Sequence, residues 1–167
     1  MTGWAPAPVT SVASYPPAPP RRPGTAVTAC VLACVLAALS VPGAVATWWS
    51  SGWSDPYGEL GSTVPRQGLV VALLEFAAVG ALVTGAVLVV TGIDRWTLVV
   101  TSVAELGFVG WWLYQLLTGP LGAVDGDRLV LGGAAAVFGV LAVATGAFAL
   151  APSTARWLAV RRAARGR

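Results

Sequence analysis

Two glutamates are the residues whose type and position could support chemistry. Glu75 and Glu105 each lie within a long apolar run that contains no basic residue at a similar depth. A lone carboxyl group in a low dielectric favours its neutral form, and charged residues within membranes usually face the interior of a helix bundle. The pattern indicates either a proton-linked or cation-binding position, or a protonated glutamate that hydrogen-bonds a neighbouring helix or a partner subunit.

The spacing along each run gives these residues different expected depths. At about 1.5 Å per residue, Glu75 lies about 9 Å from the start of its apolar run, and Glu105 lies about 13 Å from the start of the next run, which begins at the opposite side. We therefore do not expect them to share one site at one depth. The same count places Thr84 near the level of Glu105 and Trp112 near that of Glu75, and Gln115 is expected to hydrogen-bond between helices.

Other chemistries have few residues to support them. The chain has no His and no Lys, no glycine-rich phosphate loop, and no G-x-S-x-G elbow. Cys30 and Cys34 share a helix face, but no further Cys completes a metal site, so they are interpreted as packing residues. Asp125-Gly126-Asp127 lacks the other ligands of a calcium loop and predicts a turn. No catalytic, cofactor or metal site is predicted.

The elements that position the glutamates are membrane spans. Hydrophobic residues make up 56% of the 167 positions and charged residues 10%, whereas a soluble domain carries about 25% charged residues. About 20 apolar residues make one span. The sequence predicts an all-α four-transmembrane-helix bundle in residues 25–151, with spans at about 25–46, 69–91, 96–118 and 129–151.

The flanking segments differ from the spans. Residues 1–24 are rich in proline, which predicts a disordered tail, and residues 152–167 form a basic tail that could continue as an interfacial helix. Pro42-Gly43 is expected to kink or end the first span. The segment between the first two spans predicts a polar loop, with Trp48 and other aromatic side chains in the headgroup zone.

Arginine positions predict the orientation. Most arginines flank the start of the first span, the short second connection or the last span, whereas the opposite side has only Arg66 and Arg128. Because Lys and Arg accumulate in cytoplasmic loops, both termini are predicted to be cytoplasmic and the protein to lie in the cell inner (plasma) membrane. An alternative remains: Ala44-Val45-Ala46 resembles a signal-peptidase site, so the first span could be cleaved after Ala46.

Two features concern helix pairing. TGAVLVVTGIDRW (residues 84–96) aligns without gaps with TGAFALAPSTARW (residues 145–157), which is either chance or the trace of two parallel hairpins. Small residues recur at four-residue spacing, where they would let helices approach closely within the chain or in an oligomer. The candidate packing positions are Ala77, Ala81, Gly85, Gly139 and Gly146.

From the YPPAPPRRPG tail through four Ala/Val/Leu/Gly-rich spans, the layout resembles small actinobacterial four-helix membrane proteins of unknown function. No motif is specific to a family, so the resemblance implies no site residues.

Three functions fit these features. We expect a non-enzymatic accessory, assembly or scaffolding subunit of a larger cell-envelope or respiratory complex, with the lipid bilayer and a protein partner or homo-oligomer as its contacts. The alternative is a small oligomeric transporter or proton-coupled carrier that uses Glu75 and Glu105. A lipid-modifying enzyme would use the outer polar residues Asp55, Glu59, Arg66, Asp125 and Asp127. The net charge of +3 lies mainly in the tails without an aromatic-interleaved basic face, so no nucleic-acid partner is expected.

Overall fold

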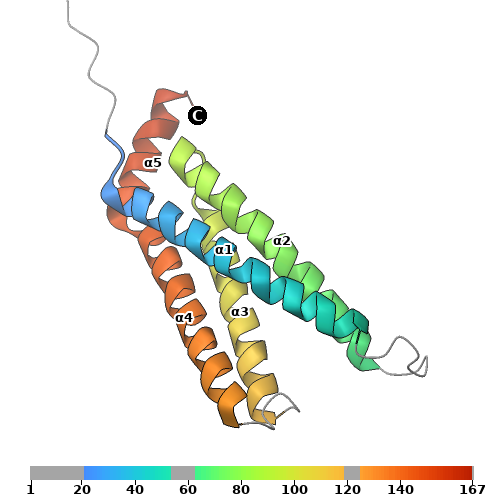
Figure 1. Ribbon diagram of the computed structural model, residues 1–167. Coiled ribbons are helices and arrows are strands. Elements are labelled where there is room, and N and C mark those ends of the chain that lie inside the picture. The colour runs from blue at the N-terminus through green and yellow to red at the C-terminus, as the bar shows by residue number, and fades with distance from the viewer. Residues whose placement is uncertain (1–20, 54–62, 119–124, 167) are drawn as a thin grey trace, which may run out of the picture.

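The computed structural model describes residues 21–53, 63–118 and 125–166, and all regular structure in these ranges is helical (Figure 1). The helices are α1 (Gly24–Trp53), α2 (Thr63–Thr91), α3 (Trp96–Thr118), α4 (Asp125–Leu150) and α5 (Pro152–Ala164). The Pro-rich segment 1–20, residues 54–62 with Asp55 and Glu59, and residues 119–124 lie outside the described residues.

Four of these helices are long and apolar enough to cross a membrane, namely Gly24–Trp48, Leu69–Thr91, Trp96–Thr118 and Arg128–Leu150. The predicted all-helical fold with four candidate spans is therefore confirmed. The orientation of the termini and the cleavage after Ala46 stay predictions.

Several helix ends differ from those predicted. α1 does not end at Pro42 but continues to Trp53, so much of the predicted polar loop is helical. A proline removes one helical hydrogen bond, and this loss is tolerated in transmembrane helices. Around Pro42, Ser40 and Thr47 donate hydrogen bonds to the carbonyl oxygens four residues before them, at 2.9 and 3.0 Å.

The other long helices also extend beyond their apolar segments. α2 begins at Thr63, well before the predicted Leu69, and α4 begins at Asp125. The Asp125-Gly126-Asp127 turn predicted from sequence is therefore wrong, because these residues form the first turn of α4. Carboxylates are favoured at this end of a helix, where the backbone N–H groups lack intrahelical acceptors.

The core of the bundle is built around α1. Its buried face consists mostly of small residues spaced three and four apart, including Ala26, Cys30, Ala33, Ala37, Ser40, Ala44 and Thr47. Small residues at this period allow neighbouring backbones to approach closely. The Cys30 thiol donates a hydrogen bond to the carbonyl oxygen of Ala86 on α2 at 3.3 Å.

The four long helices pack in a ring, in which α1 contacts α2 and α4, and α3 contacts α2 and α4. In Figure 1, the α1–α2 pair and the α3–α4 pair lie close together near α5 and diverge toward the opposite end. The diverging half is where side chains from all four helices border a cavity.

α2 and α3 approach most closely around a glycine. A Cβ at Gly85 would lie 3.0 Å from both Cα and N of Leu98, closer than nearly all real contacts. The connection that follows α2 contains Gly92, whose φ of 76° is a left-handed conformation that favours glycine. These two glycines allow α2 and α3 to form a tight antiparallel hairpin.

α5 packs against the closed end of the bundle. Thr25 at the start of α1 hydrogen-bonds Ser153 and Thr154 at 2.8 and 2.9 Å. Arg162 donates to the carbonyl oxygen of Ile93, and Arg165 donates to the carbonyl oxygens of Thr91 and Gly92 at the end of α2. Cations in this place complement the negative end of the α2 dipole.

The two aligned segments differ in their surroundings. Thr84 is exposed, whereas the matching Thr145 is fully buried. Gly85 and Gly146 both approach α3, at Leu98 and Ser102 respectively. If α1–α2 and α3–α4 were equivalent hairpins and Gly85 of α2 faced α3, Gly146 of α4 would face α1. Both glycines face α3, so the similarity of the two segments in sequence does not extend to their packing.

Candidate intramembrane pocket

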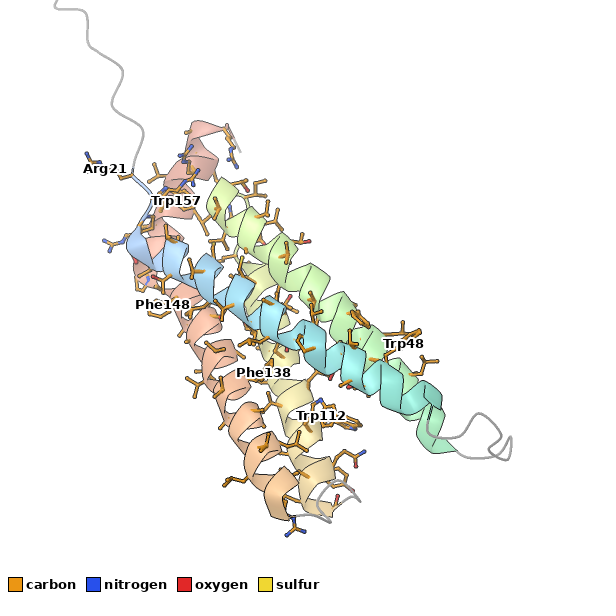
Figure 2. The ribbon with its side chains drawn as sticks, viewed as in Figure 1. Arg21, Trp48, Trp112, Phe138, Phe148 and Trp157 are labelled. Atoms are coloured by element: carbon orange, nitrogen blue, oxygen red, sulfur yellow. The ribbon has the colours of Figure 1, made fainter. Side chains whose placement is uncertain are left out.

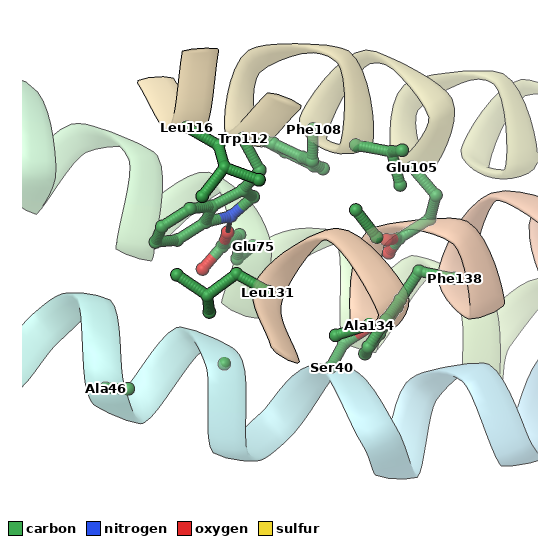
Figure 3. Close-up of a pocket in the computed structure, with 13 residues that line it drawn as sticks. Ser40, Ala46, Glu75, Glu105, Phe108, Trp112, Leu116, Leu131, Ala134 and Phe138 are labelled. Atoms are coloured by element: carbon green, nitrogen blue, oxygen red, sulfur yellow. Dashed lines mark hydrogen bonds between the residues drawn. The ribbon is translucent and has the colours of Figure 1, made fainter. Parts of the chain in front are cut away.

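A cavity of about 200 Å³ is lined by residues of all four long helices (Figure 3). These residues lie in the half of the bundle away from α5. Most of its wall is apolar, and the polar side chains that line it are Ser40, Glu75, Glu105 and Trp112. The lining residues include no Arg, so neither glutamate has a basic neighbour on the cavity wall.

Glu75 comes from α2 and is held by α3. Its side chain is 8% exposed, and its Oε1 accepts a hydrogen bond of 2.9 Å from the indole N–H of Trp112. This contact agrees with the depth expected for the two residues. The second oxygen, Oε2, is buried and has no hydrogen-bond partner among the described residues.

Glu105 comes from α3 and is the less satisfied carboxyl group. Its side chain is 5% exposed, and its Oε1 is buried with no hydrogen-bond partner in the described part of the chain. Figure 3 shows its carboxyl group on the cavity side of α3, above Phe138 of α4. An unpartnered buried polar group costs about 1–3 kcal/mol, which is why native structures contain few of them.

The two glutamates line one cavity at different levels, which the sequence did not predict. Glu105 and Trp112 are separated by about 10 Å along α3, and Glu75 lies at the level of Trp112. The cavity is long enough to include both levels, which a depth count along single helices does not reveal.

The other two polar candidates lie away from the cavity. The exposed Thr84 hydroxyl donates to the carbonyl oxygen of Gly80 on its own helix at 2.8 Å, and Gln115 is half-buried outside the cavity lining. Sequence reasoning missed Ser40, Phe108 and Phe138 as lining residues. Ser40 could have been found from its place on the small-residue face of α1.

The candidate packing positions have several environments. Ala77 is exposed and Ala81 is half-buried. Gly139 and Gly146 of α4 face α3, where added Cβ atoms would lie 3.7 Å from Val109 and 3.5 Å from Ser102. With Gly85, these glycines allow both α2 and α4 to pack against α3.

A second polar region lies at the closed end of the bundle (Figure 2). Hydrogen bonds join the start of α1 and the α2–α3 connection to α5, so Arg21, Arg95 and the α5 arginines lie at one end. Arg161 lies 5.6 Å from the ring centroid of Trp157, in cation–π geometry. This basic end is separate from the glutamate cavity.

The chemistry available to the cavity is acid–base exchange and cation binding. No group of three or more His, Cys, Asp and Glu residues that could hold a metal ion occurs in the ranges that the structure describes. Comparisons of the chain with protein-family models, curated proteins and solved structures found no match.

Proposed function

We propose that this protein is a small integral membrane carrier in which the Glu75–Glu105 cavity exchanges protons for a cationic solute. One observation carries the proposal. Two almost wholly buried carboxyl groups line one cavity, each has a buried oxygen without a hydrogen-bond partner, and the lining contains no basic residue. A buried negative charge is costly, so each of these carboxyl groups must either carry a proton or lie next to a bound cation.

The hydrogen-bonding pattern favours exchange over a purely structural role. A structural glutamate in an apolar core would satisfy its oxygens with donors from neighbouring helices. Glu75 has one such donor in Trp112, whereas Glu105 lines the cavity with an oxygen to which no described residue donates. A cation or a proton entering the cavity would supply the missing partner.

Reconstitution tests the proposal. Proteoliposomes that contain an interior pH indicator are given an outward proton gradient, and inorganic and organic cations are added separately outside. The proposal expects at least one cation to accelerate decay of the gradient. Glu105→Gln and Glu75→Gln should reduce that acceleration, whereas Thr84→Ala, which changes an exposed hydroxyl outside the cavity, should retain it. Equal acceleration by all variants would remove the cavity from the function.

A second candidate function is an accessory or scaffolding subunit of a larger cell-envelope or respiratory complex. The outward face of α2 favours it, because Ala77, Gly80 and Thr84 are exposed there and a Cβ at Gly80 would meet no atom within 4 Å. Small residues on a lipid-facing surface permit close packing of another helix. Purification in mild detergent should then recover a stoichiometric partner, and a monomer without one would contradict this candidate.

A further inference from the structure

We propose that the occupant of the cavity is a small organic ammonium ion with an apolar body. This proposal rests on the cation exchange proposed above and names the chemical class of the solute. It is carried by the combination of an apolar wall, aromatic side chains and two carboxyl groups around one cavity.

The apolar wall disfavours an inorganic ion. Leu116, Leu131 and Phe138 offer no oxygen ligands, so the oxygen atoms of the lining side chains are those of Ser40, Glu75 and Glu105. A hard cation such as Ca²⁺ takes about 6–8 oxygen ligands. An inorganic ion would lose its water shell in the cavity and regain only these few oxygens.

An organic ammonium ion matches the same wall. Its hydrocarbon groups bury apolar surface and need no oxygen ligands, while its positive charge is attracted to carboxylates and to the faces of aromatic rings. Phe108, Trp112 and Phe138 bring three aromatic side chains to the cavity from α3 and α4 (Figure 3).

The cavity size limits the solute. A volume of about 200 Å³ is below the roughly 300–1,000 Å³ of pockets for drug-sized ligands. The solute is therefore a compact ammonium ion, of the size of one ring or a few short alkyl groups.

The two carboxyl groups give the exchange its charge balance. One carboxyl group releases its proton as the monovalent cation enters, so the net charge within the cavity stays constant. Glu105 is the exchanging group, because its Oε1 has no partner, whereas Trp112 holds one oxygen of Glu75. No covalent bond forms or breaks besides the O–H bond of the released proton.

The test uses the full chain in detergent at weak buffering, with titration calorimetry and a pH indicator. Benzyltrimethylammonium is the cationic probe, and neopentylbenzene is its neutral counterpart of the same shape. We expect the cation to bind and to release protons, and the neutral compound to bind at least about tenfold more weakly, since a buried charge pair contributes more than 1.4 kcal/mol.

Variants assign the effect to the cavity. Glu105→Gln should weaken binding of benzyltrimethylammonium about tenfold or more and abolish the proton release, while Glu105→Asp should retain part of both. Thr84→Ala is the matched control outside the cavity and should behave as the wild-type chain. Gel-filtration profiles equal to that of the wild type show that the variants are folded.

Each result decides one of the two proposals. Equal binding of neopentylbenzene and benzyltrimethylammonium overturns the organic-cation proposal. That proposal is also overturned if Na⁺ or K⁺ causes Glu105-dependent proton release and benzyltrimethylammonium causes none, but this second result still supports the proposed cation carrier. Binding of benzyltrimethylammonium without proton release upholds the cation site and overturns proton exchange. Failure of every cation to release protons or bind overturns both.

Discussion

At the scale of single residues, the two cavity glutamates are not equivalent. The indole N–H of Trp112 fixes one oxygen of Glu75, which restricts the rotamers that this side chain can adopt. Glu105 has no such contact at its Oε1. In the proposed exchange, Glu105 is therefore the group that changes partners, while Glu75 keeps its contact with Trp112.

The Trp112–Glu75 hydrogen bond should contribute measurably to stability. Trp112→Phe keeps an aromatic ring but leaves Glu75 without its donor, and we expect the free energy of unfolding to fall by about 1–3 kcal/mol. Thermal unfolding in detergent measures the change. Trp111→Phe is the control, because Trp111 packs edge-on against Trp112 at a ring-centroid distance of 5.2 Å without contacting Glu75 through a hydrogen bond. Equal destabilisation by both substitutions would contradict this role.

Sequence alone identified the residues of the site better than their arrangement. Glu75 and Glu105 stand out because carboxyl groups are costly within apolar runs, and the rise per residue placed Trp112 near the level of Glu75, to which it donates a hydrogen bond. Whether two residues on different helices line one cavity depends on how each helix is rotated about its axis. For Thr84 that rotation directs the side chain outward, which its depth could not indicate.

At the scale of the elements, contact between α2 and α3 depends on the absence of a side chain at Gly85. Gly85→Ala would place a Cβ 3.0 Å from the Leu98 backbone, so the helices must separate, and we expect a loss of about 1–3 kcal/mol in the free energy of unfolding. Gly80→Ala is the matched control on the same helix, where the Cβ meets no atom within 4 Å. It should be neutral or slightly stabilising, because alanine favours the helix. Denaturant titration in mixed micelles compares the two.

Asp94 caps the start of α3 and makes that cap sensitive to pH. Its Oδ2 accepts hydrogen bonds from the backbone N–H and hydroxyl of Thr97, at 3.0 and 3.1 Å. Burial opposes the charge, but hydrogen bonds from the backbone of Thr97 and Trp96 outweigh burial and hold the pKa of Asp94 below its ordinary value of 3.8. Its ion pair with Arg162, at 3.6 Å and largely solvated, adds little.

The lowered pKa gives the sign of the pH effect. The charged cap contributes fully above the ordinary carboxyl value, and its contribution disappears as the pH falls through the lower folded value. Asp94→Ala should therefore cost about 1 kcal/mol of unfolding free energy at neutral pH, and the difference from the wild type should shrink in acid. Unfolding titrations across that range measure it, and a gap that is independent of pH would rule out the charge.

Helix ends were predictable where a turn marks them. Gly92 and Asp94 bound a short connection, and α3 begins and ends where the sequence predicted, at Trp96 and Thr118. At the opposite end of the bundle, α1, α2 and α4 continue past their apolar segments. The change from apolar to polar residues predicts where a helix leaves the apolar core of the membrane. The backbone hydrogen bonds of the helix can continue beyond that point, so the change could not locate these helix ends.

At the scale of the whole molecule, the bundle is closed at one end and divergent at the other. The closed end is fixed by α5, whose arginines bind the carbonyl oxygens that follow α2 and whose Ser153 and Thr154 hold the start of α1. The cavity lies in the divergent half. An exchange of solute would therefore move the α1–α2 and α3–α4 pairs about the end that α5 fixes.

The same end-to-end asymmetry predicts how the molecule lies in the membrane. Arg21, Arg95 and the arginines of α5 lie at the closed end. Because cytoplasmic loops of membrane proteins are enriched in Lys and Arg, we predict that the closed end is cytoplasmic. In a chain whose Cys30 and Cys34 are replaced by Ala, Arg21→Cys should be protected from a membrane-impermeant maleimide in intact cells and react after permeabilisation. Arg128→Cys, an exposed polar position just before the apolar segment of α4, should react in intact cells. The reverse pattern would place the divergent half, and with it the glutamate cavity, toward the cytoplasmic side and would contradict the orientation predicted from the arginines.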